Sequence, residues 1–346
     1  MGAMNRPVNS LRWLGALAVG LGGLAWYLRG WRPVSDVDCA RLTEPTPDET
    51  TLLNRISAEQ LRRDTVALST IQPRNAGTQG EAQAREWVAA RFQEEGLQNV
   101  RIEPIVYPRW EGKSAQLKLQ GSPGTELSCL ALSGSAATPP EGLRAPLIDV
   151  GGGQEPDYAR FSREQTQDRI HLAWGGSLHR RDICRNAGRA GATAVIIAHP
   201  DPRPAEVPAG TSYLLEAGTS TVLGRLPTLA VSHPIGQRLR EAARQGIEAW
   251  LSVDRRYTTG RGYNVVGELP GQTKEYITLV AHHDAWYSGA ADNAAGVAAT
   301  LSLARAWRCS NEQIMRPRRS IRFVSTTAEE EGLMGALVDI VLRGLR

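Results

Sequence analysis

The strand and helix patterns that alternate between residues 276 and 333 constrain the fold of this 346-residue chain more than any other feature. The apolar run Tyr276–Ala281 predicts a buried strand, and the apolar period over Ala294–Trp307 predicts a helix. A second strand pattern follows at Ile321–Ser325, and a last helix pattern begins at about Gly332. Strands that alternate with helices form a sheet covered by helices, so these residues predict an α/β domain.

A related pattern stands near the other end of the chain. Helix patterns cover Ile56–Leu68 and Glu81–Glu95, and the loop Pro73–Thr78 separates them. The alternating residues Asn99–Ile105 then predict a strand. The order of helix, loop, helix and strand is typical of the start of an α/β domain.

The residues between these two regions differ in composition. Short apolar runs such as Ala194–Ile197 are broken by Gly- and Pro-rich loops, and the helix pattern Arg181–Gly191 leads directly into that run. A chain of this length is expected to form about two domains. We therefore predict an insert within the α/β domain, with the first part of that domain at 51–125, the insert at 126–253 and the second part at 254–346.

The N-terminal residues predict a membrane-directed segment. Trp13–Leu28 is uncharged and mostly apolar, and four arginines flank it: Arg6, Arg12, Arg29 and Arg32. Sixteen residues are few for a membrane span, which needs about 20, and no clean signal-peptidase site follows. We rank an uncleaved signal anchor first, a cleaved signal peptide second and a buried core helix third. Residues 1–33 then form the targeting segment and 34–50 a linker, and the protein is expected to be membrane-anchored or exported to the periplasmic or extracellular side.

The charge distribution offers no argument for a nucleic-acid surface. The 40 basic and 36 acidic residues give a net charge of +4. The four N-terminal arginines account for all of that excess, so the remaining chain is neutral. We therefore expect no nucleic-acid partner.

Acidic and imidazole side chains follow the two C-terminal strand patterns. His282 and Asp284 come after the first strand, Asp292 opens the next helix, and Glu329, Glu330 and Glu331 come after the second strand. Ligands of open α/β sheets bind at the carboxyl ends of strands. Imidazole and carboxylate ligands beside a free carboxylate base are what a hydrolytic metal site needs.

Each of these residues also has a purely structural interpretation. His282 alone would be a hydrogen-bonded strand-end histidine, and Asp292 an N-cap of the following helix. The glutamates would favour the start of the last helix through its dipole. Taken together and in this order, with ten residues from His282 to Asp292 and 38 from there to Glu330, they favour the metal site.

Four segments carry a resemblance to a known family: 281–286 (AHHDAW), 289–293 (GAADN), 318–323 (RRSIRF) and 328–335 (AEEEGLMG). They resemble the co-catalytic dizinc exopeptidases, which include bacterial aminopeptidases and the glutamate carboxypeptidase group. The insert is similar to the protease-associated domain of that group, and Ala76–Thr78 with its following helix resembles the group's N-terminal opening. The resemblance covers roughly Ile56–Gly335. It implies a phosphorylase/aminopeptidase-like mixed sheet with helices on both faces, plus an inserted β-rich protease-associated domain.

The resemblance also implies a role for each site residue. His282 resembles the ligand of one zinc ion, Glu330 the ligand of the other, and Asp292 the carboxylate that bridges both. Glu329 resembles the general base. Asp284 is expected to accept a hydrogen bond from the far ring nitrogen of His282 and so to select its tautomer.

Two features depart from the family. The family has two more zinc ligands, an Asp some tens of residues beyond the Glu pair and a later His. All six histidines of this chain lie at or before His283, and the one acid after Glu331 is Asp339, which comes too soon. We expect a C-terminally truncated chain with an incomplete sheet that does not complete a dizinc site. A broken gene, a fragment and a genuine short form stay open. His283 points away from His282 along the strand, so it is either a substrate-side or a structural group.

The expected function is zinc-dependent hydrolysis of a peptide substrate, with an aminopeptidase ranked above a carboxypeptidase. The expected partners are a peptide and, through the N-terminal segment, a membrane, while homo-oligomerisation stays open. The alternative is a catalytically dead, membrane-anchored binding or receptor-like module that uses the protease-associated domain. The presence of all four site residues (His282, Asp292, Glu329 and Glu330) favours the enzyme, and the missing later ligands favour the alternative.

Overall fold

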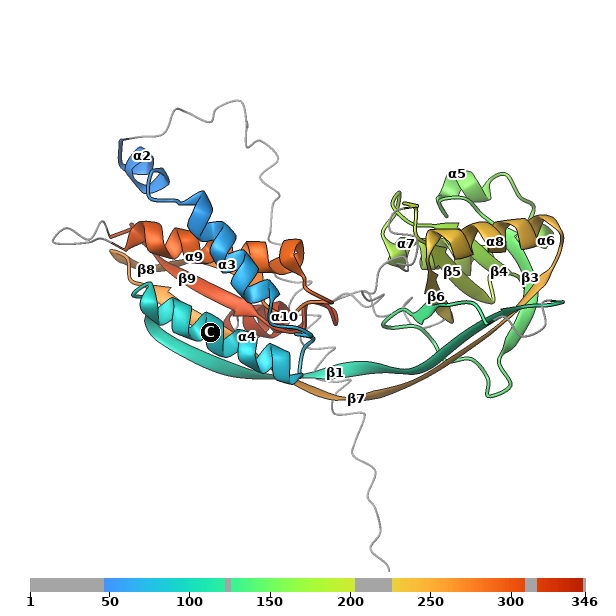
Figure 1. Cartoon of the computed structure of the whole chain (residues 1–346), viewed down its shortest axis with the longest axis horizontal. Helices are drawn as coiled ribbons and strands as arrows, with labels where there is room; N and C mark the ends of the chain where they lie inside the picture. The colour runs from blue at the N-terminus through green and yellow to red at the C-terminus, as the bar shows by residue number, and fades with distance from the viewer. Residues whose placement is uncertain (1–46, 122–125, 203–225, 309–315, 345–346) are drawn as a thin grey trace, which may run out of the picture.

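The computed structural model describes residues 47–121, 126–202, 226–308 and 316–344. They form two lobes joined by a long ribbon of two strands (Figure 1). The predicted targeting segment, residues 1–33, and most of the predicted linker lie outside these ranges. Within them, no helix is both long and apolar enough to cross a membrane.

The first lobe contains the α/β pattern predicted from the two ends of the chain. The predicted ends of three helices and of the last two strands, and the predicted start of the last helix, agree with the observed ones to within three residues, but the helix at Pro47–Leu53 was not predicted and begins within the predicted linker. The lobe consists of α2 (Pro47–Leu53), α3 (Ala58–Ser69), α4 (Gln79–Glu94), β8 (Thr273–His282), the π-helical turn η2 (Ala290–Ala294), α9 (Ala295–Trp307), β9 (Arg319–Thr326) and α10 (Met334–Gly344), together with parts of β1 and β7.

The strand predicted at Asn99–Ile105 is much longer than expected. It forms β1 (Gln98–Leu119), which pairs antiparallel with β7 (Glu248–Leu269) along nearly its whole length. Pro104 and Pro108 interrupt the sequence pattern, because proline has no N–H to donate to a neighbouring strand. Within the described residues β1 pairs with β7 alone, so the prolines stand in a strand with a free edge and do not end it.

The ribbon of β1 and β7 connects the two lobes. The first residues of β7 pair with the insert, for example Leu251 with Leu143 of β3. Its last residues pair with β9, for example Val265 with Ser325. One strand therefore belongs to both lobes, and the predicted insert 126–253 begins and ends at the far end of this ribbon (Figure 1).

The second lobe alternates strands and helices. Its elements are β2 (Leu130–Ala131), β3 (Leu143–Asp149), α5 (Glu155–Tyr158), α6 (Arg163–Thr166), β4 (Ile170–Trp174), α7 (Arg180–Arg189), β5 (Ala194–Ala198), β6 (Thr228–Val231) and α8 (His233–Arg244). Strands β3 to β6 are parallel neighbours. Parallel neighbours need crossover connections, usually helices, so the insert is more helical than the β-rich domain that the resemblance implied.

In the first lobe the sheet is mixed, with helices on both faces, as predicted. Strand β9 runs antiparallel to β7 and parallel to β8. One face packs against α3, α4 and α9 through a core that includes Leu68, Val88, Phe92, Val265, Leu301 and Phe323. On the other face Arg322 of β9 forms an ion pair with Asp339 of α10. Alternate side chains of β9 thus face opposite helical layers.

Strand β8 forms one edge of the sheet in the part of the chain that the structure describes. Its first six residues are exposed, among them Tyr276 and Ile277 at 54% and 45%. Its last two residues, Ala281 and His282, are buried. The strand therefore enters the packed core only at its carboxyl end, where the candidate site begins.

Candidate metal centre

Three of the predicted site residues meet at the carboxyl ends of β8 and β9. These strands are parallel and in register, with His282 opposite Thr326, so the residues that follow them lie at one edge of the sheet. Nε2 of His282 lies 3.0 Å from Oδ1 of Asp292 and 3.8 Å from Oε2 of Glu329. The structure thus brings together an imidazole and two carboxylates from segments up to 47 residues apart.

Asp284 joins the site in a different way from the one predicted. Its side chain is fully buried, and its two carboxylate oxygens accept the backbone N–H groups of Glu329 and Glu330 at 3.2 and 3.3 Å. Nδ1 of His282 hydrogen-bonds the backbone oxygen of Asp284 at 2.9 Å, and the carboxylate Oδ1 is farther away at 3.6 Å. The carboxylate was expected to orient the ring, but the main-chain carbonyl does so. The carboxylate instead holds the loop that carries Glu329 and Glu330, which we call the glutamate loop.

This contact determines which nitrogen of His282 is free for a ligand. A carbonyl oxygen can only accept, so Nδ1 of His282 carries the proton. In the neutral ring the lone pair is then on Nε2, which faces Asp292 and Glu329. A metal-binding histidine usually has this arrangement, with its other ring nitrogen bonded to a carbonyl or carboxylate.

The electrostatics of the site favour a bound cation. Burial raises the pKa of Glu330 to about 8, and the neighbouring Asp284 and Asp292 act in the same direction. Burial also raises the pKa of Glu329. For His282, burial lowers the pKa but the hydrogen bond and charge of Asp284 outweigh it, so the pKa rises to about 9. Several carboxylates are therefore crowded together with too little positive charge beside them.

The donor set fits zinc, but it is sparse. Zinc accepts histidine nitrogen and carboxylate oxygen at about 2.0–2.2 Å, so two of its ligands in a tetrahedron lie about 3.4 Å apart. Nε2 of His282 and Oδ1 of Asp292, at 3.0 Å, need to separate only slightly to share an ion. Glu330 is 7% exposed, and among the residues described its carboxylate has no hydrogen-bond partner. No group of three or more His, Cys, Asp or Glu side chains in those residues is arranged to hold a metal ion.

His283 is a structural group and does not face the substrate side. It is fully buried, with Nε2 3.1 Å from Oε1 of Glu81 and Nδ1 3.0 Å from Oγ of Ser325. The sequence did not identify Glu81 as a partner. It occupies the third position after the N-cap Thr78 in the pattern Thr-x-x-Glu, which is typical of a helix cap. In the folded chain Glu81 contacts His283 and Arg85 instead.

Two further features lie outside the site. Glu331, the third glutamate of the run, pairs with Arg109 of β1 at 3.4 Å.

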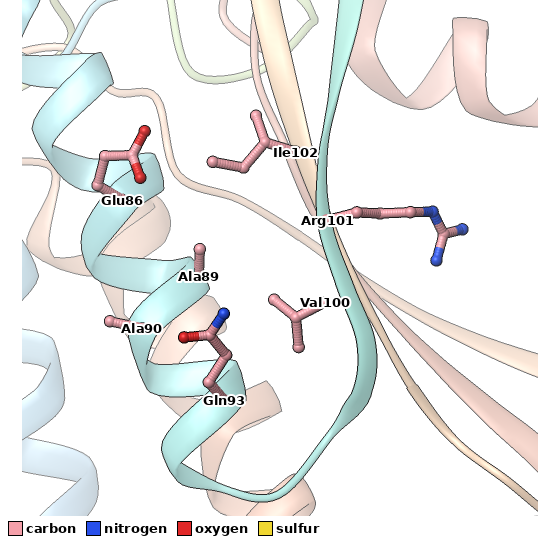
Figure 2. A pocket seen from close by; sticks show the side chains of 7 residues that line it. All are labelled: Glu86, Ala89, Ala90, Gln93, Val100, Arg101 and Ile102. Atoms are coloured by element: carbon pink, nitrogen blue, oxygen red, sulfur yellow. The ribbon is translucent and has the colours of Figure 1, made fainter.

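A pocket of about 330 Å³ lies between α4 and β1 (Figure 2). It is lined by Glu86, Ala89, Ala90, Gln93, Val100, Arg101 and Ile102. None of the predicted site residues lines this pocket, so the pocket does not belong to the candidate site.

Comparison with known sequences gives three matches of interest. Residues 264–338 match the sequence model described as Peptidase family M28. Aminopeptidase YwaD of Bacillus subtilis (strain 168) is 29% identical over 275 residues, 77% of this chain and 53% of that protein. Carboxypeptidase Q of Homo sapiens is 25% identical over 283 residues, 78% of this chain and 58% of that protein. The chain spans little more than half the length of these curated relatives.

Two solved structures share the architecture. The structure of BSAP, a zinc aminopeptidase from Bacillus subtilis, has a TM-score of 0.60 and 29% identity, over 81% of this chain and 64% of that chain. A Peptidase M28 precursor from Shewanella amazonensis SB2B has a TM-score of 0.66 and 24% identity, over 86% of this chain and 70% of that chain. The second likeness concerns the fold alone. Together they confirm the predicted α/β fold with a mixed sheet.

Proposed function

We propose that this chain, a member of the family of co-catalytic zinc exopeptidases, hydrolyses a terminal peptide bond of a peptide substrate with zinc as cofactor. The observation that carries the proposal is the meeting of His282, Asp292 and Glu329 at the ends of two parallel strands, with the buried Glu330 beside them. Adjacent glutamates allow one carboxylate to bind metal while the other moves a proton.

Each site residue has a separate role in the proposed reaction. His282 and Glu330 would each hold one zinc ion, and Asp292 would be a ligand of both. Bound zinc supplies a Lewis acid that polarises the peptide carbonyl and lowers the pKa of water to about 7. Glu329 accepts a proton from the attacking water and returns it to the leaving amine.

Asp284 supports both glutamates. Its carboxylate accepts their successive backbone N–H groups and so fixes the direction in which the two side chains leave the loop. The same residue orients His282 through its carbonyl oxygen. One residue therefore positions His282, Glu329 and Glu330.

We propose that these 346 residues, taken alone, hold zinc weakly. His282 and the shared Asp292 give one ion two protein ligands, and Glu330 with Asp292 gives the other ion two. Catalytic zinc normally has three protein ligands. The lack of any described three-residue metal group supports this count.

We propose that the released residue is the N-terminal one, so that the enzyme is an aminopeptidase. The relatives include both activities at similar identity, 29% for aminopeptidase YwaD and 25% for human carboxypeptidase Q. We also propose that residues 13–28 direct the protein to a membrane or across it, on the sequence pattern described above.

The test is a zinc titration of the full chain with paired glutamate variants. Zinc binding is measured by calorimetry, and turnover is measured on aminoacyl-anilides and on C-terminal glutamyl peptides at each zinc concentration. We expect weak zinc binding and low, zinc-dependent release of the N-terminal residue. Glu329→Gln should bind zinc as the parent does and lose that turnover.

Two results would contradict the proposal. A chain that binds no zinc at any concentration is not a zinc enzyme, and capture of a defined partner by the insert would then favour the receptor-like alternative. Two tightly bound ions with high turnover would instead refute the proposed weakness of the isolated site.

A further inference from the structure

Arg74 is a buried cation that the proposed reaction does not use. It lies in the loop between α3 and α4 and is fully buried. Its guanidinium group contacts no carboxylate at hydrogen-bond distance within the described residues; its hydrogen bonds all go to main-chain carbonyls. A buried charge needs a compensating set of polar partners, so this one has a specific structural task.

Three of the four carbonyls that Arg74 binds lie at the two ends of one short segment, and the fourth is that of Leu68 at 3.5 Å. Nε donates to His283 O at 2.9 Å, and Nη2 donates to Gly289 O at 2.6 Å. Nη1 donates to Ser288 O. The main-chain oxygen of Arg74 in turn accepts the N–H of Ala285 at 3.2 Å, which forms an isolated β-bridge. The segment 283–289, which we call the ligand loop, is thereby bound at His283 and Ala285 near its start and at Ser288 and Gly289 at its end.

The ligand loop connects the two proposed zinc-binding positions. His282 immediately precedes it, and Asp292 follows it by three residues. Asp284, which holds the backbone of Glu329 and Glu330, stands between the two residues that Arg74 binds at the start of the loop. The spacing between His282 and Asp292 therefore depends on the shape of the loop that Arg74 holds.

Gly289 shows how closely the guanidinium fits. Its φ of +46° lies in the left-handed region, which favours glycine. A Cβ at this position would lie 2.7 Å from Nη2 of Arg74 and 2.5 Å from the main-chain oxygen of Asp292. There is no room for a side chain at position 289 between the Arg74 guanidinium and the π-helical turn η2 that contains Asp292.

A second contact joins the same two regions of the chain. Glu81, seven residues after Arg74, binds the imidazole of His283, whose other nitrogen faces Ser325 of β9. The His283 side chain and the His283 carbonyl are thus both bound by residues from the 74–81 region. The start of the ligand loop is consequently anchored from one direction by two independent groups.

We propose that Arg74 is a positioning residue for the zinc site: it holds the ligand loop in the shape that places Asp292 against His282. The inference rests on the proposed function only in assigning zinc to the site. A planar guanidinium donates in several fixed directions at once, and the ammonium of lysine is a single point on a flexible chain. Lysine at position 74 would keep the charge but would not bind both ends of the loop.

The experiment compares Arg74→Lys with Arg305→Lys in the full chain. Arg305 is a matched control, because its guanidinium also makes interior bonds, to Asp64 and Glu95, but touches none of the ligand loop. Hydrogen exchange is followed by mass spectrometry in peptides spanning 283–294, in α4 and in β9. Zinc affinity and the midpoint of thermal unfolding are measured on the same samples.

We expect Arg74→Lys to speed exchange in 283–294 by at least about tenfold, as loss of a hydrogen bond to a charged group should, with α4 and β9 unchanged. Zinc affinity should fall about 10- to 100-fold, the usual effect of losing a group that supports a metal ligand. Arg305→Lys should lower the unfolding midpoint but leave the exchange of 283–294 and the zinc affinity unchanged.

Unchanged exchange in 283–294 would overturn the proposal. So would Arg74→Lys protein that does not fold, or whose α4 and β9 exchange as fast as its ligand loop, because Arg74 would then serve the whole fold. If the parent chain binds no zinc, the proposed function fails, and the exchange pattern of the metal-free protein still decides the role of Arg74.

Discussion

Replacing Asp284 by Asn tests the claim that one buried carboxylate holds the glutamate loop of the site. The substitution keeps the size of the side chain but exchanges one acceptor oxygen for an NH2 group. In the structure the two oxygens accept the N–H groups of Glu329 and Glu330. An asparagine can accept only one of them and turns a second donor toward the other.

The expected cost follows from this count. Each hydrogen bond to a charged group contributes about 1.5–3 kcal/mol, and a buried N–H without an acceptor costs about 1–3 kcal/mol. Removal of a buried charge offsets part of this loss. We therefore expect Asp284→Asn to lower the free energy of unfolding by about 2–3 kcal/mol. Since the glutamate loop is no longer held, zinc affinity should fall about 10- to 100-fold.

Urea unfolding and zinc calorimetry measure the two effects. Asp157→Asn is a suitable control, because Asp157 also accepts a backbone N–H, that of Gln154, but lies in the insert. It should cost less than about 1 kcal/mol, as expected for a partly exposed carboxylate, and leave zinc affinity unchanged. If Asp284→Asn matches this control in both assays, the carboxylate does not hold the glutamate loop and the reasoning is refuted.

Three further predictions concern separate parts of the protein. Glu330→Gln should lose zinc where Glu329→Gln keeps it; equal metal loss in both, measured by elemental analysis, would remove the assignment of Glu329 as the base. In the insert, Nε2 of His171 lies 2.8 Å from Thr166 O and Nδ1 lies 3.0 Å from the Tyr158 hydroxyl, and burial lowers the His171 pKa. The unfolded chain then binds a proton that the folded chain does not, so the contribution of His171 to stability should be constant above about pH 6.5 and fall as the pH drops below it; urea unfolding at several pH values should show this fall as a difference between the parent and His171→Gln. Finally, the full chain should fractionate with membranes and residues 34–346 should not; an intact full chain found wholly in the soluble fraction would exclude a membrane anchor.

Much of the site could be predicted from sequence because its residues follow short local patterns. His282, Asp292 and Glu329 each stand at the end of a strand pattern or the start of a helix pattern. Parallel strands bring such ends to one edge, so their meeting follows from the topology. The α/β class of this domain follows in the same way, since an apolar run followed by a helix pattern is a local signal. The mixed sheet was implied by the family resemblance.

The extent of β1 and the structure of the insert could not be predicted in this way. Pro104 and Pro108 obscure the strand pattern, and only pairing with β7, more than 140 residues later, shows that the strand continues. Helix α8 begins after Ser232 beside parallel strands whose order along the sheet the sequence does not reveal. Both features depend on which distant segment supplies the backbone hydrogen bonds.

The sequence by itself determined which residue types stand at the strand ends, and therefore the class of chemistry. Tertiary structure alone decided which atom each of them faces. The sequence does not show whether the carboxylate or the main-chain carbonyl of Asp284 faces His282. Nor does it show that Arg74 binds a loop 209 residues away. Local patterns reflect burial and helix or strand geometry, whereas a buried polar group must find its partners wherever the folded chain supplies them.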